Sequence, residues 1–275
     1  MNDARSVVVE GRGLHTGERG AVSFVRQGGP IVVRAGGVDV ELHELRVVDT
    51  TRSTTVANGD GALRIATIEH VFAALGGLGI HDGVAIEIEG REPPLADGGA
   101  RMYVDALAAL GVSSSPPGLR VARDGVIELG ASRYELFAAA SDDDVVELEV
   151  AVDFDDDRIA KSARWSGDAS DFRTRIAVAR TFGFEHELAE LASRGLASHV
   201  SPESVVVIGE GRISSSGNAF SADEPVRHKL LDLIGDLYLY GGPPRGRVRA
   251  TRPGHAATHA MMRRAFEEGL FVRSP

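Results

Sequence analysis

Residues 226–237 read VRHKLLDLIGDL, an apolar helical pattern that carries an ionisable residue at every fourth position. One stripe of this helix holds His228, Asp232 and Asp236, because residues four apart share a helix face. An ionisable group buried without a partner is costly, so such a stripe is paired, binds a metal or faces solvent. The stretch alone leaves these alternatives open, and a metal site needs further ligands from elsewhere.

A second apolar helix, predicted over residues 67–75, contains Glu69 and His70. A catalytic zinc keeps three protein ligands and one open position for water. The residues His70, His228 and Asp232 form such a set. Glu69 then lies beside the metal-bound water, where a carboxylate acts as general base without being a ligand.

Other His-x-x-x-carboxylate pairs are weaker candidates for metal ligands, since nine His and forty carboxylates produce such spacings by chance. The pair His186–Glu190 lies on a polar helix face and is expected to be solvated. The pair His199–Glu203 is interrupted by a proline, which breaks helical spacing. His255 and His259 share a predicted helix face, and we expect His259 to face solvent.

The composition limits the chemistry of any site. The chain has 275 residues, a formal net charge of −10 and no Cys. This length corresponds to one large or two small domains. The lack of Cys excludes a disulfide scaffold, a thiolate zinc finger, an iron–sulfur cluster and a Cys nucleophile. A metal site must therefore be built from His and carboxylates.

The charge and hydropathy patterns argue against nucleic-acid and membrane partners. A sequence pI near 5.4 lacks the excess of Lys and Arg that neutralises phosphates. The basic positions 245, 247, 249 and 252 alternate at a period of about two, which predicts one solvated strand face. We find no signal peptide and no apolar run long enough to span a membrane, and we expect a cytoplasmic protein.

The local patterns predict alternating groups of strands and helices. Strands are expected at residues 6–10, 20–26, 31–35, 46–48, 83–89, 119–121, 134–139, 145–154, 204–208 and 246–251, and 51–56 is a further candidate. Helices are expected at 67–75 (ended by Gly76-Gly77), 98–110, 172–180, 185–194, 225–239 (closed by Gly241-Gly242) and 255–268. The Gly-rich residues 11–17 lack the G-x-G-x-x-G spacing of a dinucleotide site and are expected to form a turn.

The two halves of the chain repeat the same order of elements. His70 and His228 are separated by 158 positions, and the same offset separates Asp97 from His255. A Ser- and Pro-rich linker at residues 113–118 divides the halves. We therefore predict an α+β protein of two similar domains, residues 1–115 and 119–275. The paired helices would bring His70 and His228 together at the interface, where small-molecule sites are common.

Five groups of residues occur in an order that resembles a known family. They are GLHTG at 13–17; TIEH at 67–70 with AAL at 73–75 and GI at 79–80; PLADG at 94–98; ARTFGF at 179–184 with SRGL at 193–196; and VRHKLLDLIGDL at 226–237 with GHA at 254–256. The chain resembles the UDP-3-O-acyl-N-acetylglucosamine deacetylases of lipid A biosynthesis. This resemblance implies that each domain packs a β-sheet on two helices, and that the helices of the two domains face each other in a β-α-α-β sandwich with zinc between them.

The resemblance also implies the remaining roles at the site. It agrees with the ligand set and base given above, and His255 looks like the general acid that protonates the departing amine. Asp236 looks like the partner that orients His255 and keeps it cationic. Thr181 is similar to the residue that helps zinc stabilise the oxyanion. Phe182 and Phe184 are similar to aromatic residues that line substrate passages, and Lys229 to a lysine near the substrate.

The implied reaction is hydrolysis of the acetamide of a UDP-linked 3-O-acyl amino sugar, with release of acetate. The implied cofactor is Zn²⁺, with Fe²⁺ as the alternative in the cell. The substrate is the expected partner, and we expect a monomer.

Two departures from the family pattern concern the substrate rather than the chemistry. The Gly-Gly pair that usually follows Arg-Gly-Leu is replaced by ASHVSP at residues 197–202. A lysine usually found near the start of the second domain is also missing, since residues 116–120 read PPGLR. These departures leave the length, and even the presence, of the acyl chain open.

Three alternatives remain at this point. The chain could be a diverged zinc deacetylase of another N-acylated sugar, a non-catalytic sensor of nucleotide sugars or lipids, or a structural interaction module. The presence of Glu69, His255 and Thr181 argues against a sensor, because a pure binder needs neither base nor acid. Ionisable stripes inside apolar helices argue against a structural module.

Overall fold

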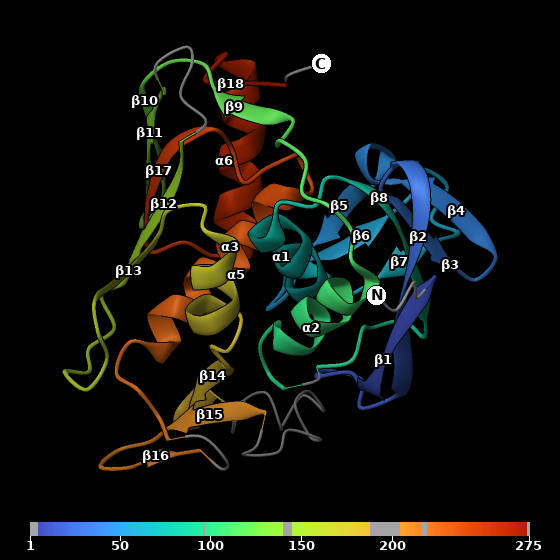
Figure 1. The fold of residues 1–275 in the computed structure, drawn as a ribbon. Helices are drawn as coiled ribbons and strands as arrows, with labels where there is room; N and C mark the ends of the chain where they lie inside the picture. The colour runs from blue at the N-terminus through green and yellow to red at the C-terminus, as the bar shows by residue number, and fades with distance from the viewer. Residues whose placement is uncertain (1–4, 96, 140–144, 188–203, 216–218, 274–275) are drawn as a thin grey trace.

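Two five-stranded sheets with the same internal order dominate the computed structural model, which describes residues 5–95, 97–139, 145–187, 204–215 and 219–273 (Figure 1). The first sheet has the order β1-β2-β8-β3-β4. Its strands are β1 (Ser6–Arg12), β2 (Arg19–Pro30), β3 (Val32–Ala35), β4 (Val38–Glu41) and β8 (Asp82–Glu89). The pair β3–β8 is parallel, and all other neighbours are antiparallel.

The second sheet repeats this topology with the order β10-β11-β17-β12-β13. Its strands are β10 (Gly125–Leu129), β11 (Ser132–Phe137), β12 (Val146–Ala151), β13 (Ser162–Trp165) and β17 (Gly246–Thr251). The pair β12–β17 is parallel, and the remaining neighbours are antiparallel. Each strand of the first sheet therefore has a counterpart of the same position and direction in the second.

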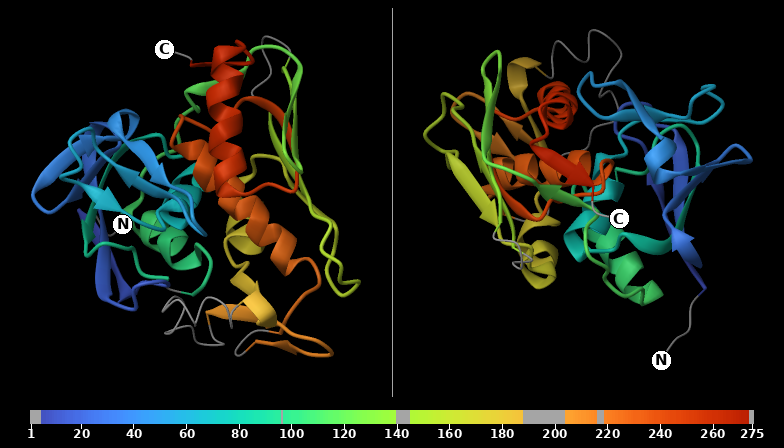
Figure 2. Two further views of the ribbon diagram at one scale, coloured as in Figure 1. Left: turned by 180° about the vertical axis from the view of Figure 1, so that it is seen from behind. Right: turned by 90° about the horizontal axis from the view of Figure 1, so that it is seen from above.

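Four helices lie between the two sheets (Figures 1 and 2). They are α1 (Glu69–Leu78), α2 (Arg101–Leu110), α5 (Glu224–Tyr238) and α6 (His255–Glu267). α2 packs on β1 and β2, whereas α5 packs on β12 and β13 and α6 on β10. α1 and α5 pack on each other so closely that a Cβ atom on Gly235 would lie 2.0 Å from the carbonyl oxygen of Glu69.

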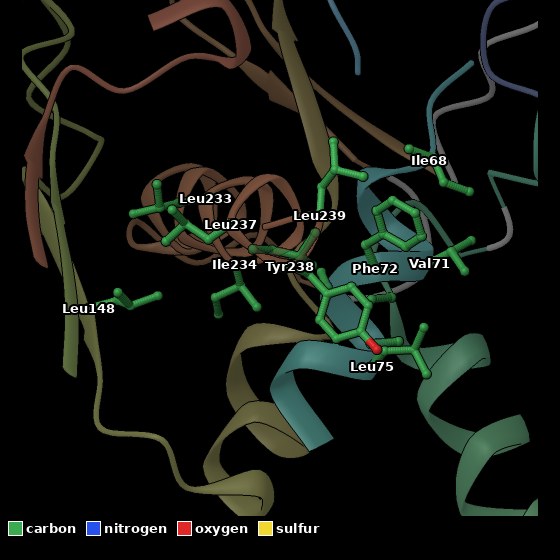
Figure 3. Packing of buried hydrophobic residues seen from close by; sticks show 14 of the residues in the cluster. Ile68, Val71, Phe72, Leu75, Leu148, Leu233, Ile234, Leu237, Tyr238 and Leu239 are labelled. Atoms are coloured by element: carbon green, nitrogen blue, oxygen red, sulfur yellow. The ribbon is translucent and has the colours of Figure 1, made fainter. Parts of the chain in front are cut away.

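Apolar side chains between these helices form one continuous core (Figure 3). Phe72 and Leu75 of α1 face Ile234 and Tyr238 of α5, and all four are almost fully buried. Burying each such side chain stabilises the fold by about 1.5–3 kcal/mol. The core therefore fixes α1 against α5 and, with them, the ionisable groups that follow the same helices.

Shorter elements occupy much of the remaining part of the chain that the structure describes. They are the 3-10 turn η1 (Leu42–Glu44), β5 (Arg46–Asp49), β6 (Thr55–Ala57), β7 (Arg64–Ile65), β9 (Leu119–Val121), α3 (Ala169–Asp171), the π-helical turn η2 (Phe172–Ile176), β14 (Thr181–Phe184), β15 (Val205–Ile208), β16 (Ile213–Ser214) and β18 (Phe271–Arg273). They form the small sheets β5-β6-β7, β14-β15-β16 and β18-β9. In the described part of the chain, no helix has the length and apolar character needed to cross a bilayer.

The strand and helix predictions agree with the structure for most of the longer elements, and β9 and β17 have the predicted bounds. The predicted end of the first helix at Gly76-Gly77 is wrong, because both glycines lie inside α1 and the helix ends at Gly79, with φ of 66°. A Cβ on Gly77 would lie 2.3 Å from the ring of Phe172. This glycine is needed for close packing rather than for capping.

The predicted helix over residues 172–180 is also wrong. The segment begins with the five-residue η2 turn, which directly follows α3, and then leads into β14, which pairs with β15 in parallel. The amide of Thr181 donates to the carbonyl oxygen of Gly98 at 2.7 Å, so tertiary pairing overrides the local helical pattern. Of the candidate strand at 51–56, only the end belongs to β6. The predicted helix at 185–194 continues into residues 188–203, outside the described residues, where Glu190, His199, Glu203 and the ASHVSP segment also lie.

Of the four basic positions predicted to share a solvated strand face, 247 and 249 lie in β17 and do so, whereas Arg245 and Arg252 flank the strand and Arg245 is half-buried. Arg247 and Arg249 are exposed, and they pair with Glu147 and Glu149 of the neighbouring strand. These arginines are held by carboxylates on their own sheet. Of the Gly-rich residues 11–17, the first two end β1 and residues 13–17 form the predicted turn between β1 and β2.

Candidate metal and catalytic site

The helices α1 and α5 bring three potential metal ligands into one buried cluster. Oδ1 of Asp232 lies 3.4 Å from Nε2 of His228 and 3.8 Å from Nε2 of His70. One ligand atom from each residue lies within 4.8 Å of the others, and among the described residues this is the cluster of His and carboxylates that could hold a metal. The prediction that these three side chains lie together is therefore confirmed.

The protonation states in this cluster suit a metal site. Burial lowers the pKa of His70 to about 3, and burial likewise lowers the pKa of His228. Nδ1 of His228 donates to the carbonyl oxygen of Ala179 at 3.0 Å, which leaves Nε2 with a free lone pair. Burial opposes ionisation of Asp232, but the charge of Lys229 holds its pKa well below the usual range. Two neutral imidazoles and one carboxylate form a nitrogen and oxygen donor set that fits zinc.

Glu69 lies beside this cluster at the start of α1. Its Oε2 accepts a hydrogen bond from the backbone N–H of Thr54 at 3.0 Å, and its Oε1 lies 3.9 Å from Nε2 of His255. Burial, together with the charges of Asp232 and Asp236, raises the pKa of Glu69 to about 7, although His255 opposes this shift. A carboxylate with this pKa is suited to accept a proton near neutral pH.

His255, the first residue of α6, is paired with Asp236 of α5. Its Nδ1 donates to Oδ2 of Asp236 at 2.9 Å. Burial alone would lower the pKa of His255, but the Asp236 carboxylate raises it to about 10. The imidazole is therefore protonated at neutral pH, and its Nε2 lies towards Glu69. One group able to accept a proton and one able to give a proton thus lie on either side of a short gap.

A cavity of about 260 Å³ opens onto these groups. Its lining includes all three potential ligands, Glu69, His255, Thr181, Phe182, Phe184 and Lys229. Of the residues predicted for the site, only Asp236 is absent from the lining, and it lies behind His255. The cavity therefore collects nearly all the predicted site residues from segments far apart in the sequence.

Aromatic side chains form one wall of the cavity. Phe182 and Phe184 of β14 pack edge to face on Phe154, which the sequence analysis did not identify. The ammonium of Lys229 lies 5.9 Å from the centre of the Phe182 ring and donates to Oδ2 of Asp232 at 2.9 Å. Lys229 is thus held between the potential metal site and the aromatic wall.

Several residues at the site were missed or misjudged from the sequence. His259 was expected to face solvent, but it is buried, and its Nε2 lies 3.3 Å from Oδ1 of Asp236 in α5. Its signal was the helical spacing from His255. Thr54 belongs to the β-branched run that was read as a strand, and no local pattern marks its bonds to Glu69 and Asp236.

Two further residues line or support the cavity without having been predicted. Arg52 has a left-handed backbone with φ of 66°, and its guanidinium pairs at 3.4 Å with Glu187, which also lines the cavity. Glu92 is buried and accepts from the amides of His15 and Thr16 and from the hydroxyl of Thr67. Glu92 thereby holds the 11–17 turn against the site.

Comparison with known proteins places the chain in a family. The sequence model for UDP-3-O-acyl N-acetylglycosamine deacetylase matches residues 4–267. A UDP-3-O-acyl-N-acetylglucosamine deacetylase of Teredinibacter turnerae is 34% identical over 92% of this chain and 85% of the relative. Proteins of the same name from Shewanella loihica and Myxococcus xanthus are 34% and 33% identical, over 95% and 94% of this chain and 88% and 84% of the relatives. With a match of this extent, the chain belongs to the UDP-3-O-acyl N-acetylglycosamine deacetylase family.

Proposed function

We propose that this protein hydrolyses the acetamide of UDP-3-O-acyl-N-acetylglucosamine and releases acetate, as a deacetylase of lipid A biosynthesis. One observation carries the proposal: Glu69, with a pKa near 7, and His255, with a pKa near 10, both lie beside a buried cluster of three potential metal ligands. A hydrolase of amides needs a base for water and an acid for the leaving amine. The names of the relatives supply the substrate.

Zn²⁺ is the metal that we propose for the cluster, with His70, His228 and Asp232 as its ligands and Fe²⁺ as the alternative. When bound, zinc supplies a Lewis acid that polarises a carbonyl group and makes a nearby water more acidic. The deprotonated Nε2 atoms and the ionised carboxylate support this assignment. Lys229 also bonds to Asp232 and thereby orients a ligand from outside the cluster.

In the proposed reaction, the residues beside this cluster act one after another. Glu69 removes a proton from the attacking water as the new C–O bond forms at the acetamide carbon. The hydroxyl of Thr181 donates to the carbonyl oxygen as it becomes negative, and one such donor contributes about 3 kcal/mol to transition-state stabilisation. His255 then gives its Nε2 proton to the amine nitrogen as the C–N bond breaks, while Asp236 keeps the imidazole oriented.

The cavity wall supports a substrate with both charged and apolar parts. Lys229 supplies a cation for the anionic nucleotide portion, and Phe182 and Phe184 supply apolar surface for substrate passages. We further propose that the protein consists of two similar domains, residues 1–115 and 119–275, with the helices of each domain facing those of the other. The matching order of the two five-stranded sheets supports this division.

The test is metal analysis of the purified protein combined with measurement of acetate released from UDP-3-O-acyl-N-acetylglucosamine. We expect about one zinc per chain and acetate release that a chelator abolishes. Zinc without acetate release would contradict the substrate and point to another N-acylated sugar. If the protein neither contains zinc nor releases acetate, the proposal that it is an enzyme would be wrong, and a binding protein would be indicated.

A further inference from the structure

The two oxygens of Asp236 have different partners. Oδ2 accepts from Nδ1 of His255, whereas Oδ1 lies 2.6 Å from the hydroxyl of Thr54 and 3.3 Å from Nε2 of His259. Thr54, Asp236 and His259 are each no more than 2% exposed. A carboxylate buried this deeply needs hydrogen-bond donors at both oxygens, so the partners of Oδ1 determine how Oδ2 points.

We propose that Thr54, His259 and Tyr240 form a positioning relay that fixes the carboxylate of Asp236 and reserves its Oδ2 for His255. The inference rests on the proposed function, in which His255 is the general acid. None of the three residues lines the cavity, so they act on the reaction through Asp236 rather than by touching the substrate.

The direction of each hydrogen bond follows from the chemistry of the groups. The ionised carboxylate only accepts, so the Thr54 hydroxyl donates its hydrogen to Oδ1. That hydrogen is then committed, so Nε2 of His259, 3.0 Å from the same hydroxyl oxygen, must be a donor. The other ring nitrogen, Nδ1, lies 3.0 Å from the phenol of Tyr240.

Tyr240 is suited to the end of this chain of donors. Burial raises the pKa of Tyr240 to about 12, so the phenol keeps its hydrogen at physiological pH. The phenol donates to Nδ1 of His259, which selects the ring form that carries hydrogen on Nε2. The hydrogen on Nε2 of His259 lies between the Thr54 hydroxyl oxygen, at 3.0 Å, and Oδ1 of Asp236, at 3.3 Å, so the carboxylate cannot rotate without breaking buried hydrogen bonds.

Thr54 also connects the acid to the base. Its hydroxyl holds Asp236, and its backbone N–H donates to Oε2 of Glu69 at 3.0 Å. One residue of the first half of the chain thus positions both groups proposed to move protons. This arrangement sets the separation of 3.9 Å between Nε2 of His255 and Oε1 of Glu69.

A double-mutant cycle tests the relay. Thr54→Val and His259→Leu each remove a hydrogen-bond donor to the relay. The values of kcat and KM are measured for each variant alone and in combination with Asp236→Asn. Each single change should lower kcat by about 10- to 100-fold, the range found for outer partners of site residues, with KM and bound metal unchanged. In the Asp236→Asn background both effects should vanish, because the relay acts only through that carboxylate.

Conservative variants separate positioning from general stability. Thr54→Ser and His259→Gln keep a donor and should recover most of kcat. Tyr238→Phe is the matched control, since it removes a buried phenol that donates to the carbonyl oxygen of Ile80, away from Asp236. Its kcat should equal that of the wild type. Additive effects in the double variants, or equal losses from Thr54→Val and Thr54→Ser, would overturn the relay.

A second readout does not depend on turnover. Imidazole ¹⁵N NMR of the metal-free protein should show hydrogen on Nε2 of His259 and none on its Nδ1. The downfield Nδ1–H signal of His255 should weaken in Thr54→Val and His259→Leu and persist in Tyr238→Phe. Hydrogen on Nδ1 of His259 would overturn the relay even if the enzyme is active. If the wild type releases no acetate, the proposed function is wrong. The NMR measurement still tests the relay in that case, because it does not require turnover.

Discussion

His70 and His228 lie edge to face with their ring centres 5.1 Å apart, although one belongs to the first half of the chain and the other to the second. The rings are held there by the packing of α1 on α5, in which Gly235 lies against the backbone of Glu69. The potential metal site is therefore a property of the helix interface rather than of either helix. Any change that moves α1 against α5 should disturb metal binding.

Adding one methyl group at this interface tests that dependence. A Cβ on Gly235 would lie 2.0 Å from the carbonyl oxygen of Glu69, so Gly235→Ala should force the helices apart. We expect a loss of about 1–3 kcal/mol in the free energy of unfolding, together with weaker metal binding. Thermal unfolding and metal titration measure the two effects. Gly118→Ala is the control, since a Cβ there meets no atom within 4 Å, and its stability should match the wild type.

Removing a proposed ligand should empty the metal site. Asp232→Ala removes the carboxylate that lies within 4 Å of both proposed imidazole ligands. After dialysis against a weak chelator, elemental analysis should find far less than one metal per chain, with acetate release lost in parallel. A variant that keeps its full metal content would remove Asp232 from the ligand set.

Removing the proposed general acid should lower kcat but leave the metal content unchanged. His255 lies outside the three-residue cluster, so His255→Ala should retain metal while kcat falls by about 10²–10⁴-fold, the usual contribution of an acid or base group. The measurement is kcat together with metal content of the same preparation. Loss of metal in this variant would argue that His255 has a structural role at the metal site instead.

Neutralising Asp236 should shift the alkaline limb of activity. The pKa of His255 is raised to about 10 because Asp236 outweighs the effect of burial. The acid works only while protonated, so activity is lost as pH rises through this pKa. Without the carboxylate charge, Asp236→Asn should lower the pKa of His255 and move the loss of activity to lower pH. If the wild type and Asp236→Asn lose kcat over the same alkaline pH range, Asp236 does not raise the pKa of His255.

His81 should make stability depend on pH in the acidic range. Burial lowers its pKa to about 4 from the ordinary 6.5, and its ring stacks on Tyr238. The unfolded chain binds the proton at a higher pH than the folded protein. Above pH 6.5 His81 is neutral in both states and costs the fold nothing. As pH falls from 6.5 towards 4, the unfolded chain gains this proton and the folded protein does not, so the free energy of unfolding decreases.

The variant His81→Phe keeps the stacked ring but cannot bind a proton. Between pH 6.5 and 4 its free energy of unfolding, measured with denaturant, should fall less steeply than that of the wild type. Equal slopes for the two proteins would show that His81 does not contribute to acid sensitivity.

The fold was predictable where local pattern and final structure agree. The 225–239 and 255–268 helices show apolar periodicity over several turns, and α5 and α6 match them within one residue at each end. The glycines of α1 were misread because the contact that requires Gly77, with Phe172, lies far away in sequence. The short β14 was missed because its pairing with β15 depends on a distant partner rather than on its own four residues.

The sequence by itself determined the donor types, because a chain without cysteine offers a metal only nitrogen and oxygen. It also determined the stripe of His228, Asp232 and Asp236, because a helix repeats every 3.6 residues whatever surrounds it. Only the tertiary structure decided the placement of Thr54, whose hydroxyl contacts His259 and Asp236 across 205 and 182 positions of the chain. Hydrogen bonds over such separations leave no local periodicity, since they exist only after the core has packed α5 against its neighbours.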